Sequence, residues 1–129
     1  MQNHYSYFII WFLFLNGIYA QNKILPNSQS IKINLNKLKR NPQNDTSRVR
    51  ILTSLAVDYY EFENNKMGFY AQQAIDLAQK INDPKGLMKG YRLLGVCYLS
   101  DSKYELAEQN VLKAMQIGNQ QKNEVEILK

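Results

Sequence analysis

The sequence has few of the side chains that enzymes and metal sites use most. Its 129 residues contain one histidine, His4, and one cysteine, Cys97. A single cysteine cannot form an intrachain disulfide or a cysteine-cluster metal site, and we expect Cys97 to be a small packing residue. His4 lies in a segment that we expect to be removed, so the mature chain would have no imidazole for proton transfer or metal binding. We therefore expect no metal and no cofactor.

The sequence also lacks the short motifs of common active sites. It has no glycine-rich phosphate loop, no G-x-S-x-G segment and no H-E-x-x-H segment. Carboxylates do occur close together, but no acid or base partner accompanies them, and such residues are usually solvated on helix faces. The three pairs are Glu61 and Glu63, Glu105 and Glu108, and Glu124 and Glu126. We predict that the chain is not an enzyme.

The net charge of +5 is distributed unevenly along the chain. Up to residue 50 there are seven basic residues and one acidic residue, Asp45, whereas beyond it nine basic residues meet ten acidic ones. The basic residues thus lie in a mostly polar leading segment, without the aromatic residues or the known module of a nucleic-acid surface. We expect a solvated basic segment and no nucleic-acid partner.

Residues 1–20 read MQNHYSYFIIWFLFLNGIYA and contain an apolar run from Tyr7 to Leu15. The run is shorter than the ~20 residues that a helix needs to span a bilayer, and it has the length of a signal-peptide core. Ala20 supplies the small residue that precedes a cleavage site. We therefore predict a signal peptide over residues 1–20 and an exported protein of the periplasm or cell envelope.

No lysine or arginine precedes the apolar run, although a basic start is usual for a signal peptide. The alternative is an uncleaved N-terminal anchor over the longer stretch from Tyr5 to Ala20. In that case the protein would stay at the membrane, and the basic stretch from Lys32 to Arg50 would meet anionic lipid headgroups. We expect a membrane contact only in this alternative.

Apolar residues recur at helical spacing along the rest of the chain. Residues 21–46 form a polar linker, in which Ile31, Leu35 and Leu38 predict a short helix that ends before Pro42. Four longer helices are predicted beyond it, over about 47–62, 66–80, 84–99 and 103–117.

Short polar segments set the predicted helix boundaries. Asp45 supplies an N-cap side chain for the first long helix, and Asp83 followed by Pro84 is typical of a helix start. The segment 100–103 has the short polar side chains of a turn. Gly118 and Asn119 predict the end of the last helix.

The four long helices repeat one pattern with a period near 40. The clearest copy comprises Tyr91, Leu94, Gly95 and Tyr98 on one helix and Ala107, Val111 and Ala114 on the next. At offsets of 39 and 40 the corresponding residues are Leu52, Leu55, Ala56, Tyr59, Met67, Ala71 and Ala74. Gly95 costs about 1 kcal/mol of helix propensity relative to alanine, so we expect a neighbouring helix to approach it closely. A fixed period of this length is typical of stacked helical hairpins.

The spacing aromatic-x2-L-G-x2-Y, followed by A-x3-apolar, resembles the tetratricopeptide repeat. From about Ile31 to Lys129 the chain resembles the repeat region of exported or membrane-spanning bacterial sensors. The residues that carry this wider likeness are Asp45-Thr46, Arg48-Val49, Tyr70-Ala71, Gln73-Ala74-Ile75, Leu77-Ala78 and Ile81-Asn82-Asp83. The resemblance implies an all-α solenoid of antiparallel hairpins, with repeats at 47–83 and 84–120 and the start of a third at 121–129.

The resemblance also implies a function. First helices of such repeats line a groove that binds peptides or partner proteins, so we expect a non-catalytic interaction module. The alternative is the input domain of a two-component sensor kinase or a similar signalling protein, without its output domain. The groove candidates, which lie outside the packing stripes, are Arg50, Thr53, Val57, Tyr60, Lys89, Arg92, Val96 and Leu99. Val57 and Val96 stand where chaperone-binding members carry asparagines, which argues against a cochaperone.

The third repeat would be unfinished, because the sequence stops at Lys129. Val125 and Leu128 would then lack the partner helix that a complete repeat provides. We therefore expect the C-terminal face to associate with a second copy or with further repeats.

Overall fold

The computed structural model describes residues 28–127, and the side chains as far as residue 122. This part of the chain is all-α and contains no strand. Its helices are α2 (Ser28–Arg40), α3 (Thr46–Asp58), α4 (Asn64–Lys80), α5 (Pro84–Ser100) and α6 (Tyr104–Ile127). The predicted signal peptide, residues 1–20, lies outside the described residues.

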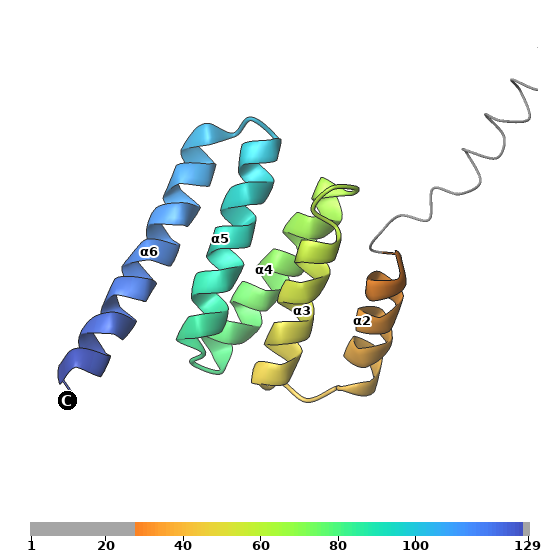
Figure 1. Ribbon diagram of the computed structural model, residues 1–129, viewed down its shortest axis with the longest axis horizontal. Coiled ribbons are helices and arrows are strands. Elements are labelled where there is room, and N and C mark those ends of the chain that lie inside the picture. Colours follow the sequence, from red (N-terminus) through yellow and green to blue (C-terminus); the bar gives the residue numbers. More distant parts are fainter. Residues whose placement is uncertain (1–27, 128–129) are drawn as a thin grey trace, which may run out of the picture.

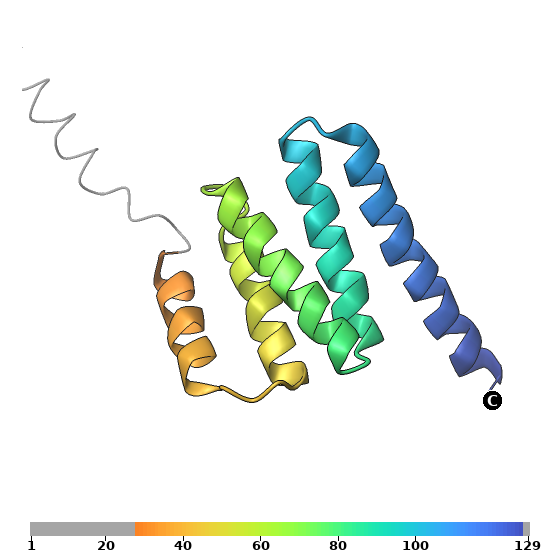
Figure 2. The same ribbon diagram turned by 180° about the vertical axis from the view of Figure 1, so that it is seen from behind.

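The helices form a single row in which each one packs antiparallel on the next along the chain (Figure 1). α4 lies behind α3 in Figure 1 and in front of it in Figure 2. One further pair is in contact, α3 with α5, whereas α2 does not contact α4 and α4 does not contact α6. The row therefore bends, and α3 and α5 lie on its inner side.

The predicted helix starts are confirmed. The carboxylate of Asp45 accepts the backbone N–H of Arg48 at 2.9 Å, and that of Asp83 accepts the N–H of Gly86 at 3.0 Å. Each bond satisfies one of the backbone donors that a helix leaves free in its first turn. Pro84 lies at the first helical position, where a missing N–H costs nothing.

The turns that follow α4 and α5 have the same backbone conformation. Asn82 and Ser102 have positive φ angles of 55° and 59°, the left-handed conformation that ends a helix. The next N–H then reaches back to a carbonyl of the last turn. Asp83 N donates to Ala78 O at 2.8 Å, and Lys103 N donates to Tyr98 O at 2.9 Å. The predicted turn at 100–103 is confirmed.

Two predicted helix ends are wrong. α3 stops at Asp58 rather than at 62, because the following N–H groups bond at shorter range, as in Tyr60 N to Val57 O. α6 passes through Gly118 and Asn119 and runs to Ile127. Glycine ends a helix where it takes a positive φ, and Gly118 does not. The predicted start of a third repeat at 121 therefore falls inside α6.

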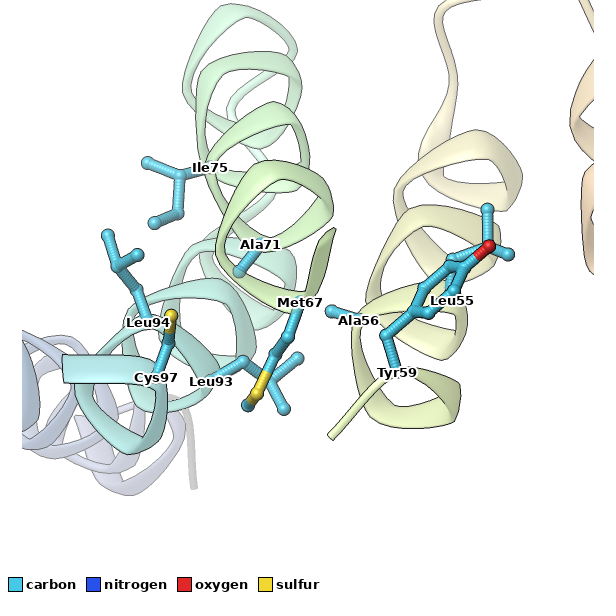
Figure 3. Close-up of a cluster of buried hydrophobic side chains, with 9 residues drawn as sticks. All are labelled: Leu55, Ala56, Tyr59, Met67, Ala71, Ile75, Leu93, Leu94 and Cys97. Carbon is cyan, nitrogen blue, oxygen red and sulfur yellow. The ribbon is translucent and has the colours of Figure 1, made fainter. Parts of the chain in front are cut away.

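The core lies where α3, α4 and α5 meet (Figure 3). Its buried residues come from α3 with its C-cap, from α4 and from α5. They are Leu55, Ala56, Tyr59, Met67, Ala71, Ile75, Leu93, Leu94 and Cys97. A second buried cluster continues toward the opposite ends of α3 and α4. It comprises Val49, Leu52, Ala74, Leu77 and Ala78.

Glycines allow the helices to approach each other. A Cβ atom added at Gly95 would lie 3.2 Å from the carbonyl oxygen of Ala107, so this position confirms the expected close approach of α5 and α6. A Cβ added at Gly90 would lie 2.6 Å from Cγ1 of Ile75, across the α4–α5 contact. Any larger side chain at either position would push the helices apart.

A polar contact that the sequence did not predict holds α2 on α3. The Asp58 carboxylate is buried and accepts Ser30 Oγ at 2.9 Å and Asn34 Nδ2 at 2.7 Å. Arg48 Nη1 donates to the carbonyls of Leu38 and Asn41 at 3.1 and 2.6 Å, at the end of α2. The predicted short helix is confirmed, and buried charge-assisted bonds contribute to its attachment.

Alanine substitutions at two helical glycines test the role of close packing. Gly95→Ala and Gly118→Ala gain the same helix propensity, about 1 kcal/mol, but only Gly95 faces a backbone carbonyl of another helix. The nearest atom to an added Cβ at Gly118 is Sδ of Met88, at the flexible end of a side chain. Urea unfolding should show the Gly95→Ala chain less stable than the Gly118→Ala chain by about 1–3 kcal/mol. Equal stabilities would contradict the packing account.

Removing the buried carboxylate should loosen α2 selectively. Asp58→Ala should lower the free energy of unfolding by about 1–3 kcal/mol and speed amide hydrogen exchange in α2 more than in α5 and α6. The control is Asp76→Ala, since Asp76 is exposed and accepts only Gln72 Nε2 among the described hydrogen bonds. It should change stability by less than about 0.5 kcal/mol.

Candidate interaction surface

The eight residues predicted to bind a partner form two matching stripes. On the first, Arg50, Thr53, Val57 and Tyr60 follow steps of three, four and three residues along α3 and the turn after it. The second stripe repeats these steps on α5 with Lys89, Arg92, Val96 and Leu99. Because α3 and α5 are in contact, both stripes lie on the two inner helices of the row.

Most of these side chains reach the surface. Val57, Tyr60 and Leu99 are large apolar or aromatic residues that are about half exposed. Arg50 and Arg92 are exposed, whereas Lys89 and Val96 are partly buried. Val96 packs against the core.

Thr53 requires a correction. Its side chain is 1% exposed, and its hydroxyl donates to the carbonyl of Arg50 at 3.0 Å within the same helix. The prediction placed Thr53 on an open face because it lies outside the apolar stripe of α3. Packing of α5 against α3 covers it, so Thr53 contributes to the floor of the surface and presents almost nothing to a partner.

A hollow of about 430 Å³ lies between α3 and α5 and brings three of the predicted residues together. These are Arg50, Thr53 and Lys89. The remaining lining residues are Thr46, Val49, Asp83, Lys85 and Gly86. The hollow has three basic side chains, Arg50, Lys85 and Lys89, against the single carboxylate of Asp83, one oxygen of which accepts the N–H of Gly86, so its net charge is positive. We call this the α3–α5 hollow.

A larger groove, of about 580 Å³, lies between α5 and α6. The lining residues are Lys85, Met88, Lys89, Arg92, Val111, Ala114, Met115, Gly118 and Asn119. Lys89 and Arg92 were predicted from the sequence, but the apolar side chains of Met88 and Met115 were not. The groove has an apolar floor and three basic side chains along one wall. We call it the α5–α6 groove.

The described residues contain no cluster of three or more histidine, cysteine, aspartate or glutamate side chains placed to hold a metal ion. The thiol of Cys97 is buried and donates to the carbonyl of Asn64 at 3.4 Å. Burial raises the pKa of Cys97, and the nearby Asp101 carboxylate raises it further. The thiol is therefore protonated at neutral pH, and the expected packing role of Cys97 agrees with its place in the core.

Four of the seven basic residues of the leading segment lie on α2, which has no acidic residue: Lys32, Lys37, Lys39 and Arg40. Among the residues that the structure describes, no helix combines the length and the apolar character that a membrane crossing demands.

Comparison of the chain with protein-family models, with curated proteins and with solved structures finds no match. The assignment of a function therefore depends on the geometry of the two surfaces and on the sequence pattern.

The burial of Cys97 predicts slow thiol chemistry. At pH 8 the folded chain should react with a thiol reagent such as DTNB roughly 10-fold or more slowly than the chain unfolded in urea. The reason is that folding both shields the sulfur and raises its pKa, so less thiolate is present. A native rate equal to the unfolded rate would show that Cys97 is accessible.

Proposed function

We propose that the chain is a non-catalytic protein–protein interaction module of the tetratricopeptide type, which binds a peptide or a partner protein on the inner face formed by α3 and α5. The predicted signal peptide supports a location in the bacterial cell envelope, which is part of the proposal. The observation that carries the proposal is the repetition of one packed hairpin, α3–α4, by a second, α5–α6, at the period of the sequence pattern.

Equivalent residues of the two hairpins have equivalent environments. Leu55 and Leu94 are both buried, as are Ala74 and Ala114, at offsets of 39 and 40 residues. The pair Ala56 and Gly95 is buried too. Small residues thus recur where helices cross and larger ones fill the space between them, which supports a stacked repeat.

The inner face has the composition of a peptide-binding surface. The α3–α5 hollow supplies Arg50 and Lys89, whose side chains can pair with carboxylates. Val57, Tyr60 and Leu99 add exposed apolar area beyond the hollow on the same two stripes. Basic and apolar groups arranged in this way suit an extended peptide with an acidic residue and apolar anchors.

The proposal predicts which substitutions reduce partner capture. The double variant Arg50→Glu, Tyr60→Ala should retain less than about a tenth of the envelope proteins bound by the unchanged chain in a cross-linked pull-down. Neither side chain belongs to a core cluster, so circular dichroism and the unfolding midpoint should stay close to the parent values.

The matched control is Lys80→Glu with Gln72→Ala on α4, at exposed positions away from the two inner helices. This variant should capture the same partners as the unchanged chain. If both double variants lose capture equally, or if neither does, the inner face is not the binding surface.

A further inference from the structure

The α5–α6 groove lies on the second hairpin. The equivalent surface of the first hairpin, α3–α4, is covered. There, five residues of α3 and α4 are at most 2% exposed. They are Val49, Thr53, Ala71, Ile75 and Ala78. The equivalents at offsets of 39 and 40 residues are Met88, Arg92, Val111, Met115 and Gly118, all of which line the groove. Met88, Val111 and Met115 are 38%, 39% and 59% exposed.

Helix α5 accounts for this difference, because it covers the first surface. Gly86 meets Val49, and Gly90 meets Ile75, with 2.6 Å from an added Cβ to a Cγ1 atom in each case. A Cβ added at Gly90 would also lie 3.5 Å from the carbonyl oxygen of Ala71. Two small residues four apart thus let a helix backbone lie in the cleft between the two helices of a hairpin.

We propose that the α5–α6 groove binds an amphipathic helix of a partner protein, which places small residues four apart against Met88 and Met115 and acidic residues opposite Lys85, Lys89 and Arg92. This surface shares Lys85 and Lys89 with the α3–α5 hollow, but its apolar floor of Met88, Val111 and Met115 is not part of the inner face, and the inference does not depend on the function proposed there. It depends on the equivalence of the two hairpins.

The charge of the groove argues for an acidic occupant. Its lining contains three basic residues and no acidic one. The equivalent positions in the first hairpin are Thr46, Arg50 and Thr53, which include a single basic residue. The side chains of α5 and its N-cap that line the α3–α5 hollow with them are Asp83, Lys85 and Lys89. In the α5–α6 groove a helix docked in the same way faces more basic side chains. It therefore requires acidic residues at the three positions that correspond to Asp83, Lys85 and Lys89.

The same charges disfavour α2 and α5 of a second copy of the chain as occupants. α2 carries four basic residues and no acidic one, and α5 itself carries Lys85, Lys89 and Arg92. Either helix would bring positive charge against positive charge.

The groove also limits the length of the bound helix. In the first hairpin, α5 continues to Cys97, whose sulfur lies 2.9 Å from a Cβ added at Gly68. In the second hairpin the residue equivalent to Gly68 is Glu108, which is exposed. Its longer side chain leaves no room for a helix backbone at that end of the α5–α6 groove. The bound helix should therefore make its contacts over about 11 residues, or three turns.

The probe for this proposal is a peptide copied from α5. It has the sequence of residues 83–100 with Lys85→Glu, Lys89→Glu and Cys97→Ala, and it carries a fluorophore at its N-terminus. The first control peptide keeps both lysines, and the second adds Gly90→Leu to the acidic peptide. Fluorescence anisotropy with the full chain should show that the acidic peptide binds roughly 10-fold more tightly than the lysine peptide. The Gly90→Leu peptide should show no saturable binding.

Substitutions in the chain locate the site. Met115→Glu should abolish binding of the acidic peptide. Leu112→Glu is the matched control, since Leu112 is also an exposed apolar residue of α6 but does not line the groove. In the variant Lys89→Glu, Arg92→Glu the preference should reverse, and the lysine peptide should bind more tightly. Arg50→Glu should leave binding unchanged, which separates this site from the inner face.

Three outcomes would overturn the proposal. The first is that neither peptide binds to the chain. The second is that Met115→Glu and Leu112→Glu have equal effects on binding, and the third is that sedimentation shows a dimer that Met115→Glu converts to a monomer. The last result would make a second copy of the chain the occupant of the groove.

Discussion

The close crossing of α5 over α4 is the contact on which the arrangement depends. Gly90 has no side chain, and Ile75 fills the space that a side chain at position 90 would need. This approach lets α5 reach both helices of the preceding hairpin, so that Val49 and Thr53 of α3 are covered as well. Without it the two hairpins would share little core, because among the described helices only the smaller α3–α5 contact would still join them and α4 does not touch α6. A hairpin pair of this size has little other buried apolar surface to stabilise it.

The chain uses apolar and polar contacts at different places in the row. Between α3, α4 and α5 the contact is apolar and dense, with Leu55, Ala56 and Ala71 fully buried. At α2 it includes a buried carboxylate, Asp58, bound by Ser30 and Asn34. The polar contact is directional, because its hydrogen bonds form in one register only, and that fixes where α2 lies on α3. At α6 the side facing the α5–α6 groove is apolar and exposed, which is the basis of the second proposed binding surface.

Local chemistry explains what the sequence could predict. The spacing of apolar residues gave the five helices, the Asp45 and Asp83 carboxylates marked two helix starts, and Gly95 signalled a close crossing. Features that depend on contacts between distant segments were missed. Asp58 meets Ser30 and Asn34 across 28 and 24 residues, and no local pattern indicates that pairing.

Thr53 was expected on the surface because it lies outside the apolar stripe of its own helix. Its burial is caused by another helix, which the local sequence does not indicate. Gly118 was read as a helix end, although glycine stops a helix only with the left-handed geometry that Asn82 and Ser102 adopt. Exposed apolar area near the C-terminus was expected from Val125 and Leu128, but the described part of it lies at Met88, Val111 and Met115.

The helices contact mainly their neighbours in the chain, and this affects how the molecule responds to mechanical tension. Apart from α3 with α5, each helix touches only the helix before and the helix after it. Few contacts join segments far apart in the chain, a topology that favours rapid folding and gradual loss of structure from the ends. Tension applied at the two ends of the row would peel off α2 first, because its packing on α3 is the least extensive between neighbouring helices. For a row stabilised by contacts between neighbours, we expect unfolding under tension in steps rather than in a single event.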